Sequence, residues 1–433
     1  MTSESTPHGP SRYRWVVFSL LGAGYLFVNF HRLCPAVVAV DLMRDLDTGA
    51  GILGLLASAY FYPYAVMQIP SGLLSDSLGP RKTITGFFLI AGLASILFGM
   101  AGSVKWAMIA RVLVGLGVSM YFVPTMKILT RWFKVSEFAL MTGFLMGIGG
   151  IGSLSAAGPL AYLSATFGWR SSFVFIGVIT VAISVAIWFF VRNAPEDMGL
   201  PSVEHPTTSD PGSKQTIALW QGVKMVLGAF RFWSLAGWFF FDFGIFFSFA
   251  GLWGGPYLMH IYGLSKPEAG NILSMAPLAI VIGSPIHSLL SDHLFRSRKK
   301  TLVGSALAMV LLTVPLAFFP ADLNVPLLYA WCFLFGFFGS AAVTVGFASI
   351  KEQFPVEIAG TAVGLVNLMP FLGAAIMQPV LGLILESHGK TEAGFPPEAY
   401  QKAFFLYFIT ALIAFLSACC IRETIRSGKA ASA

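Results

Sequence analysis

Charged residues are scarce in this sequence: Asp, Glu, Lys and Arg together make up 11% of its 433 residues. A soluble domain usually carries about 25% charged residues. Hydrophobic residues, by contrast, account for 56% of the chain, and its mean hydropathy is +0.77. The scarcity of charge excludes an ordinary soluble protein, and the composition indicates an integral membrane protein built from apolar segments.

Cysteine is also rare, and the four cysteines, Cys34, Cys332, Cys419 and Cys420, all fall in apolar segments. They form no CxxC pair and have no histidine at the spacing of a metal site. The sequence also lacks a Walker loop for nucleotide phosphates and the HExxH and G-x-S-x-G motifs. We therefore expect no metal, no cofactor and no enzyme activity, and an ion or solute gradient as the source of energy.

Apolar segments long enough to cross a bilayer recur along the whole chain. A spanning helix needs about 20 mostly apolar residues. Twelve segments meet this measure, at roughly 15–40, 50–74, 83–102, 106–130, 138–165, 171–191, 232–260, 268–290, 301–320, 325–350, 358–385 and 402–421.

One long polar stretch, residues 192–216, is rich in Pro, Ser, Thr and Gly and divides these segments six and six. We expect an N-terminal six-helix bundle in residues 1–191, a cytoplasmic linker in residues 192–231 and a C-terminal six-helix bundle in residues 232–433.

Basic residues gather on one side of the predicted membrane. If the N-terminus and the even loops are cytoplasmic, that side collects most of the Lys and Arg, including Arg81, Lys82, Arg131 and Lys300. The other side receives only Arg44, Lys105, Arg170, Lys266, Lys390 and Lys402. This bias, and a polar start without a signal-cleavage pattern, place both termini in the cytoplasm, and we expect the bacterial inner membrane. The net charge of +7 then reflects topology, and no nucleic-acid partner is expected.

A charged turn, GLLSDSLGPRK at residues 72–82, follows the second predicted helix. Gly79 and Pro80 favour a tight turn, and Asp76 at a helix end can pair with a basic residue. A degenerate copy with Asp292 follows the eighth helix, so the two halves are similar. The turn resembles the G-x-x-x-D-x-x-G-x-R-K signature of the major facilitator superfamily, with Gly72, Asp76, Gly79, Arg81 and Lys82 in place.

That resemblance implies an all-α membrane protein with twelve transmembrane helices. They form two six-helix bundles related by pseudo-two-fold symmetry, with a site between the bundles. It also implies that the turn and its second copy at Asp292 act as a conformational latch for the rocking halves.

The fourth predicted helix carries RVLVGLG, in which Arg111, Gly115 and Gly117 resemble the R-x-x-x-G-x-G motif of the same superfamily. Together with Arg32 in the first helix, this is similar to the branch of anion:cation symporters and organophosphate permeases. In that branch an arginine in each of these two helices grips a carboxylate or phosphate. His31 stands where the branch carries an acid, and Val118 where several proton-coupled members carry glutamate.

An arginine inside an apolar span costs about 2.5–3.5 kcal/mol on insertion scales and usually faces a cavity. Asn29 and Tyr25 share a helical face with Arg32, and this polar stripe suits a water-filled cavity. Snorkelling to the surface is the alternative for Arg32 and Arg111, and for Lys127 near the inner end. In a cavity, guanidinium groups favour carboxylate or phosphate through charge-assisted bonds.

Two further residues are candidates for proton coupling. His31 can titrate near neutral pH, or it can simply be hydrogen-bonded within the bundle. Asp242 is the only carboxylate deep in an apolar span of the second half, where it can titrate, pair with an arginine across the cavity, or form a static ion pair. The expected substrate-binding residues are Arg32, Arg111, Asn29, Tyr60, Tyr64, Trp253, Tyr257 and Asn367, with Gln68 and Gln378 nearby.

These features predict a secondary active transporter that moves a small organic anion by alternating access, by symport with protons or another coupling ion. The substrate class is a carboxylate, sugar acid or organophosphate, and we expect a monomer in the bilayer. Two alternatives stay open: a permease for peptides, amino acids or drug-like solutes, and a membrane metabolite sensor that does not transport.

Overall fold

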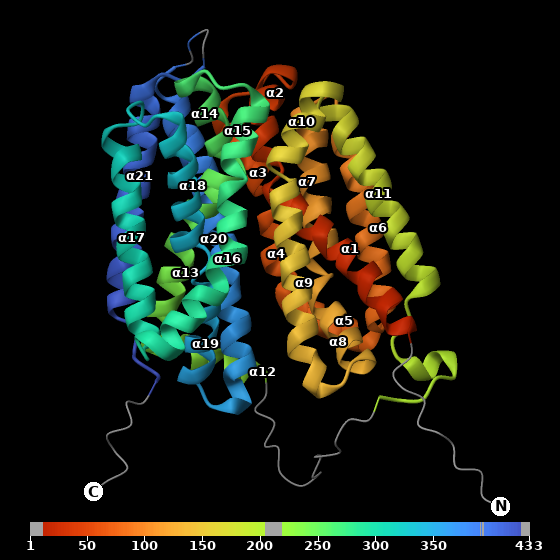
Figure 1. Ribbon diagram of the computed structural model, residues 1–433. Coiled ribbons are helices and arrows are strands. Elements are labelled where there is room, and N and C mark those ends of the chain that lie inside the picture. Colours follow the sequence, from red (N-terminus) through yellow and green to blue (C-terminus); the bar gives the residue numbers. More distant parts are fainter. Residues whose placement is uncertain (1–11, 204–218, 390, 392–393, 426–433) are drawn as a thin grey trace, which may run out of the picture.

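The computed structural model describes residues 12–203, 219–389, 391 and 394–425, and the described chain is almost entirely helical (Figure 1). Within it, 11 helical stretches are long and apolar enough to span a membrane. A bent pair, Ala50–Val66 with Pro70–Ser77, raises the number to 12 if it counts as one span. The predicted all-α fold is therefore confirmed.

The first half of the chain forms α1 to α11. These helices are α1 (Tyr13–Leu33), α2 (Pro35–Asp45), α3 (Ala50–Ser58), α4 (Phe61–Val66), α5 (Gln68–Ser77), α6 (Pro80–Gly99), α7 (Val104–Ser119), α8 (Phe122–Trp132), α9 (Val135–Ser155), α10 (Gly158–Phe167) and α11 (Trp169–Phe190). We call this set the N-terminal half.

The second half forms α12 to α21 and two π-helical turns, η2 and η3. These elements are α12 (Leu219–Leu227), α13 (Phe230–Ser248), η2 (Phe249–Trp253), α14 (Gly254–Tyr262), α15 (Lys266–Leu273), α16 (Met275–Leu289), η3 (Leu290–Leu294), α17 (Arg298–Phe318), α18 (Val325–Gly339), α19 (Val343–Gln353), α20 (Val356–Glu386) and α21 (Pro397–Cys419). We call this set the C-terminal half.

The expected linker, residues 192–231, lies only partly within the described residues, because 204–218 fall outside them. Its described part contains a short 3-10 helix, η1 (Pro195–Met198), and α12. The first 11 and last 8 residues, on which the expected position of the termini rests, also lie outside the described chain.

α2 follows the first span directly, with only Cys34 between α1 and α2. Cys34 between them keeps helical backbone angles (φ −58°, ψ −24°), and Pro35 occupies the first position of α2. Proline is tolerated there because the first turn of a helix leaves its N–H without a partner anyway. Arg32 lies in the last turn of α1, and the 11 residues of α2 follow it, so about 20 Å of helical chain separates Arg32 from Asp45.

The two halves stand side by side, with α1 to α11 on the right of Figure 1 and α13 to α21 on the left. We call the end of the molecule where α1 begins and α21 ends the terminal face. The other end, where α2 ends and α15 begins, is the opposite face (Figure 1).

Contacts between the halves concentrate at the opposite face. The Lys266 ammonium forms an ion pair with Asp41, and the backbone N–H of Gly51 donates to the Glu386 carboxylate at 2.9 Å. Two glycines allow the helices to touch: a Cβ on Gly255 would lie 1.9 Å from the Ala36 carbonyl oxygen. Small residues of this kind permit close packing in lipid, where dispersion rather than the hydrophobic effect holds helices together.

The second such glycine, Gly382, would place a Cβ 2.3 Å from the carbonyl oxygen of Ala50. Toward the terminal face, the last hydrogen bond between the halves in the described chain joins Asn367 and Gln68 at 3.2 Å. The halves are thus locked together at the opposite face and pair only internally at the terminal face.

Candidate functional site

Arg32 lies at the interface between the halves, where aromatic rings from both surround its guanidinium. Its Cζ is 5.2 Å from the ring centres of Tyr64 and Phe371 and 6.0 Å from that of Phe247. Nη2 donates to the Tyr64 hydroxyl at 3.0 Å, and Nη1 to Oδ1 of Asn29 at 3.4 Å. Rings stabilise a cation through their negative faces but leave its charge uncompensated.

Arg111 comes from α7 and is buried, with 2% of its surface exposed. Its Nη1 donates to the backbone oxygen of His31 at 3.2 Å and to Cys34 Sγ at 3.8 Å. Its Cζ stands 5.0 Å from the ring centre of Tyr60. Nε and Nη2 are buried and have no hydrogen-bond partner in the described chain. The side chain therefore does not snorkel to the surface.

Two stacked tyrosines connect the arginines. Tyr60 and Tyr64 are one helical turn apart, and their ring centres lie 5.7 Å apart with an interplanar angle of 19°. One guanidinium stands over each ring. Among the described residues, no carboxylate lies within 4 Å of Arg32 or Arg111. Two cations enclosed by protein without an acid leave a strongly positive site that an anion would neutralise.

The neighbours of Arg32 on α1 are placed as follows. Asn29 is buried, donates to the Tyr25 carbonyl at 3.1 Å and accepts from Arg32. The His31 ring is 1% exposed and packs edge-on against Phe30, and its Nε2 has no partner among the described residues. The polar stripe expected on this helix therefore exists, and it packs against protein.

Two polar residues meet from opposite halves on the terminal-face side of the arginines. Asn367 Nδ2 donates to Gln68 Oε1, and Gln68 Nε2 donates to the Tyr64 carbonyl at 3.3 Å. One turn further along α20, Phe371 packs against Tyr64, with ring centres 4.4 Å apart. Tyr64 and Phe371 thus lie against Arg32, and the amide pair is linked to them through the Tyr64 carbonyl.

The structure does not bring Trp253 and Tyr257 to the arginines. Trp253 Nε1 donates to the Gln378 carbonyl at 2.9 Å. The Tyr257 hydroxyl donates to the Pro320 carbonyl, and its ring packs against Phe404 with centres 4.9 Å apart. Both side chains are fully buried in the C-terminal half.

Asp242 is also separate from the arginines. It lies on α13, is 0% exposed, and neither carboxylate oxygen has a hydrogen-bond partner among the described residues. It forms no ion pair there either, so neither the expected pairing across a cavity nor a static salt bridge is present.

The signature turn pairs within its own half. Asp76 forms an ion pair with Lys127 at 2.5 Å, and Lys127 also donates to the Gly72 carbonyl at 3.1 Å. The expected pairing of Asp76 with a basic residue is therefore present. The ammonium group of Lys127 forms this ion pair, whereas the alternative was that it extends only into water. Gly79 has φ +85°, a conformation that favours glycine over other residues.

The rest of the turn is fixed to the end of α11. The Arg81 guanidinium donates to the Trp188 carbonyl at 3.1 Å and stands 4.5 Å from the centre of its ring, while Lys82 is exposed. Within the described part of the chain, no residue of the turn forms an ion pair with the C-terminal half. The turn thus joins helices of one half and leaves the interface free at the terminal face.

The second copy is similarly internal. Asp292 pairs with Arg298, which also pairs with Glu352 at 3.0 Å. Glu423, beyond α21, accepts from the Ser297 hydroxyl and from the Arg298 amide. Burial alone would raise the pKa of Glu423, but these hydrogen bonds outweigh it and hold that pKa below its usual value.

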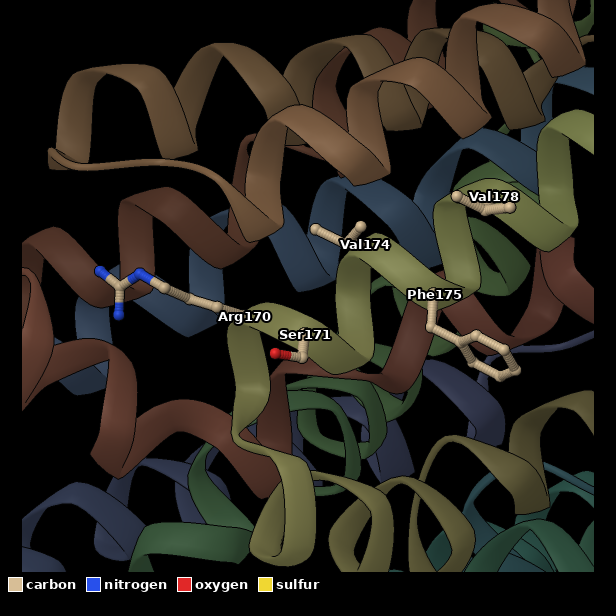
Figure 2. Close-up of a pocket in the computed structure, with 5 residues that line it drawn as sticks. All are labelled: Arg170, Ser171, Val174, Phe175 and Val178. Atoms are coloured by element: carbon tan, nitrogen blue, oxygen red, sulfur yellow. The ribbon is translucent and has the colours of Figure 1, made fainter.

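A groove on the outer surface of α11 lies away from all of these residues. It is lined by Arg170, Ser171, Val174, Phe175 and Val178 (Figure 2). In Figure 2 the Arg170 side chain extends away from Phe175 and Val178, and its guanidinium forms an ion pair with Asp45 at 2.9 Å. This groove contains no residue predicted to bind substrate.

The sequence reasoning missed three residues that shape the region. Nothing in the sequence separates Phe247 and Phe371 from the many other phenylalanines. Only their contact with Arg32 distinguishes them. Lys266 was recognised as an outer basic residue, but nothing local indicated that it pairs with Asp41, 225 residues away.

The comparisons with known proteins agree with this architecture. The model of the Major Facilitator Superfamily matches residues 17–255 and 243–432. The probable sulfoacetate transporter SauU of Cupriavidus necator is 22% identical over 401 residues, covering 88% of this chain and 90% of that protein. The probable galactarate/D-glucarate transporter GudP of Escherichia coli is 24% identical over 439 residues, covering 94% and 92%.

A solved structure shows the same fold. The crystal structure of a bacterial homologue of the human lysosomal transporter Spinster aligns with a TM-score of 0.77 at 18% identity, covering 95% of this chain and 98% of that one. The relatives are also consistent with the resemblance to the anion:cation symporter and organophosphate permease branch. The chain belongs to the Major Facilitator Superfamily, and it is a multi-pass membrane transporter.

Proposed function

We propose that this protein is a secondary transporter for small organic anions, in which Arg32 and Arg111 bind the acidic groups of the substrate. The observation that carries the proposal is the pair of guanidinium groups without any acid within reach in the described chain. Arg111 keeps two nitrogens free of partners, and these are suited to a bidentate contact with carboxylate, sulfonate or phosphate.

The relatives support the acidic nature of the substrate. Sulfoacetate, galactarate and glucarate, named for the two curated relatives, are all organic acids. A neutral sugar or amide would leave both guanidinium charges uncompensated in a site of low polarity, which costs several kcal/mol for each ion. Tyr60, Tyr64 and Asn29 contact the arginines, and Asn367 is linked to Tyr64 through Gln68; all four can bind hydroxyl groups of a sugar acid.

The arrangement of contacts supports alternating access between the two bundles, residues 1–191 and 232–433. The halves meet at the opposite face through Asp41, Lys266 and Glu386, and the signature turn does not bridge them at the terminal face within the described residues. With both termini cytoplasmic, as the basic residues favour, this conformation is closed to the outside. We further propose that a monomer in the plasma membrane couples transport to protons.

The decisive test is binding of an acid to the Arg32→Ala variant. Purified protein in detergent would be titrated with sulfoacetate and with galactarate, and binding measured as a rise in thermal stability, since a ligand of the folded state raises it. Wild type should respond to at least one acid and not to galactose. The variant should lose the response, because one lost charge-assisted contact costs about 1.5–3 kcal/mol, or roughly 10- to 150-fold in affinity.

A matched control is Arg44→Ala, which removes an exposed arginine at the opposite face and should leave the response unchanged. An Arg32→Ala variant that binds and transports these acids as wild type does would refute the assignment. A wild type that binds neutral amides or peptides as tightly as acids would also refute it. Binding without any flux in proteoliposomes would favour a sensor over a transporter.

A further inference from the structure

Asp242 is buried where no hydrogen bond or ion pair within the described chain would stabilise an ionised carboxylate. It lies in the middle of α13, is 0% exposed, and neither oxygen has a hydrogen-bond partner in the described chain. Burying an unpaired charge costs many kcal/mol, whereas a neutral carboxylic acid costs only its missing hydrogen bonds. In this conformation the acid therefore keeps its proton.

The helices that pack against α13 contain no charge that could change this. In the described chain they are α12, η2, α18, α19, α20 and α21. Neither η2 nor α18 carries a charged residue, and the charged residues on the others are all exposed: Lys224, Lys351, Glu352, Glu357, Glu386, Glu398 and Lys402. The less exposed titratable groups on these helices are Cys332, Cys419, Tyr329, Tyr400 and Tyr407, and none of them bonds to Asp242.

On α13 itself, Arg231 is in the first turn, about 16 Å along the helix from Asp242, and stands over the ring of Phe354 at 4.5 Å. Trp238, one turn before Asp242, buries an indole N–H that also lacks a partner among the described residues. Residues four apart share a helical face, so this N–H lies on the same face of α13 as the carboxyl group.

We propose that Asp242 is the site of the coupling proton, and that it is distinct from the site of the anion; this rests on the proposed function as an organic-anion transporter. When the proton leaves, the Asp242 O–H bond breaks, the proton passes to water on the side to which the halves open, and the carboxylate keeps the electron pair. The reverse step takes a proton from the other side. No other reactant is needed.

α13 connects the two sites mechanically. Phe247, five residues after Asp242 on the same helix, lies over the Arg32 guanidinium at 6.0 Å. A movement of α13 relative to the other helices of its own half would therefore change both the cover over Arg32 and the surroundings of Asp242. His31 is the less suitable proton carrier. The hydrogen bond from Arg111 to the His31 backbone holds a guanidinium close to this residue, and a protonated His31 ring would be a second cation beside it, which is unfavourable.

The test compares wild type with Asp242→Asn in proteoliposomes, using labelled sulfoacetate and galactarate and an internal pH dye. We expect the variant to exchange the acid at equal pH on both sides at a rate close to that of wild type. Accumulation driven by an inward proton gradient should fall by at least about ten-fold, the equivalent of 1.4 kcal/mol, and proton entry with the acid should disappear. His31→Gln, the matched control, should keep proton entry.

The outcomes separate the two proposals. Proton-driven accumulation and proton entry at wild-type levels in Asp242→Asn would overturn the assignment of Asp242 while leaving the anion transporter intact. A wild type that exchanges no acid would overturn both. Should the variant fail to fold, wild type can be treated with an apolar carbodiimide, which modifies protonated buried carboxyl groups. Modification of Asp242 with loss of accumulation supports the proposal, and accumulation that survives complete modification overturns it.

Discussion

The two halves of this transporter enclose unpaired ionisable groups of opposite kind, bases in one half and an acid in the other. The N-terminal half holds Arg32 and Arg111 over a pair of stacked tyrosines, and the C-terminal half holds Asp242 among apolar helices. Electrostatics alone would favour pairing the acid with a base, yet no such pair exists among the described residues. Each group is instead left available to something outside the chain.

The positions of these groups differ as much as their chemistry. Arg32 lies at the interface, in contact with rings from both halves. A solute that enters between the halves can therefore reach it. Asp242 is inside one half, with every charged residue on the helices packed against α13 at an exposed position. A site at the interface suits a whole molecule, whereas a site within a bundle suits a proton.

The largest effect is expected from removing the deeper cation. Arg111→Ala should lower affinity for the bound acid by at least about 100-fold, since it deletes two buried guanidinium nitrogens that have no partner in the described chain, each worth about 1.5–3 kcal/mol to a charged partner. The change would be measured by calorimetric titration with the acid that stabilises wild type best.

Arg111→Lys is the matched comparison, because it keeps the charge and loses the planar fork. It should bind with an affinity between those of wild type and the alanine variant. Equal affinities for wild type and Arg111→Ala would mean that the N-terminal half does not hold the anion with both arginines, and the contrast between the halves would lose its basis.

A smaller effect of opposite direction is expected in the other half. Asp242→Leu should raise the free energy of unfolding by about 1–3 kcal/mol, because it replaces an unsatisfied buried polar group by an apolar one of similar size. Denaturant titration of the purified protein in one detergent would measure it. Asp242→Asn retains an unsatisfied polar group, so its free energy of unfolding should not rise. An Asp242→Leu variant that is less stable than wild type would show that the carboxyl group has a partner.

Local composition was enough to predict much of this structure. The twelve apolar segments and the signature turn at Gly79 follow from hydropathy and turn chemistry, which act over a few residues. Tyr60 and Tyr64 share a helical face by their spacing of four, and they do meet the arginines.

The side to which Trp253 and Tyr257 point could not be predicted. The π-helical turn η2 inserts an extra residue before α14, which rotates everything after it relative to Asp242 on α13. The pairing of Asp41 with Lys266 could not be predicted from the sequence either, because it depends on how two separate bundles dock. Contacts of that kind are set by tertiary packing and leave no local signal in the sequence.

The smallest expected effect concerns the one ion pair that joins the halves in the described chain. Asp41 and Lys266 are 12% and 17% exposed, so their pair is partly shielded from water and worth about 0.5–1 kcal/mol. Asp41→Asn should therefore shift the equilibrium toward the form open at the opposite face by roughly two- to five-fold. Distances between spin labels on α2 and α15 would report the shift. Lys266→Gln should give the same result, and the double variant should add nothing further, since both changes remove one interaction. Additive shifts would indicate that the two side chains act independently, and that Asp41 is held mainly by Arg44, whose Nη2 lies 3.5 Å away in its own half.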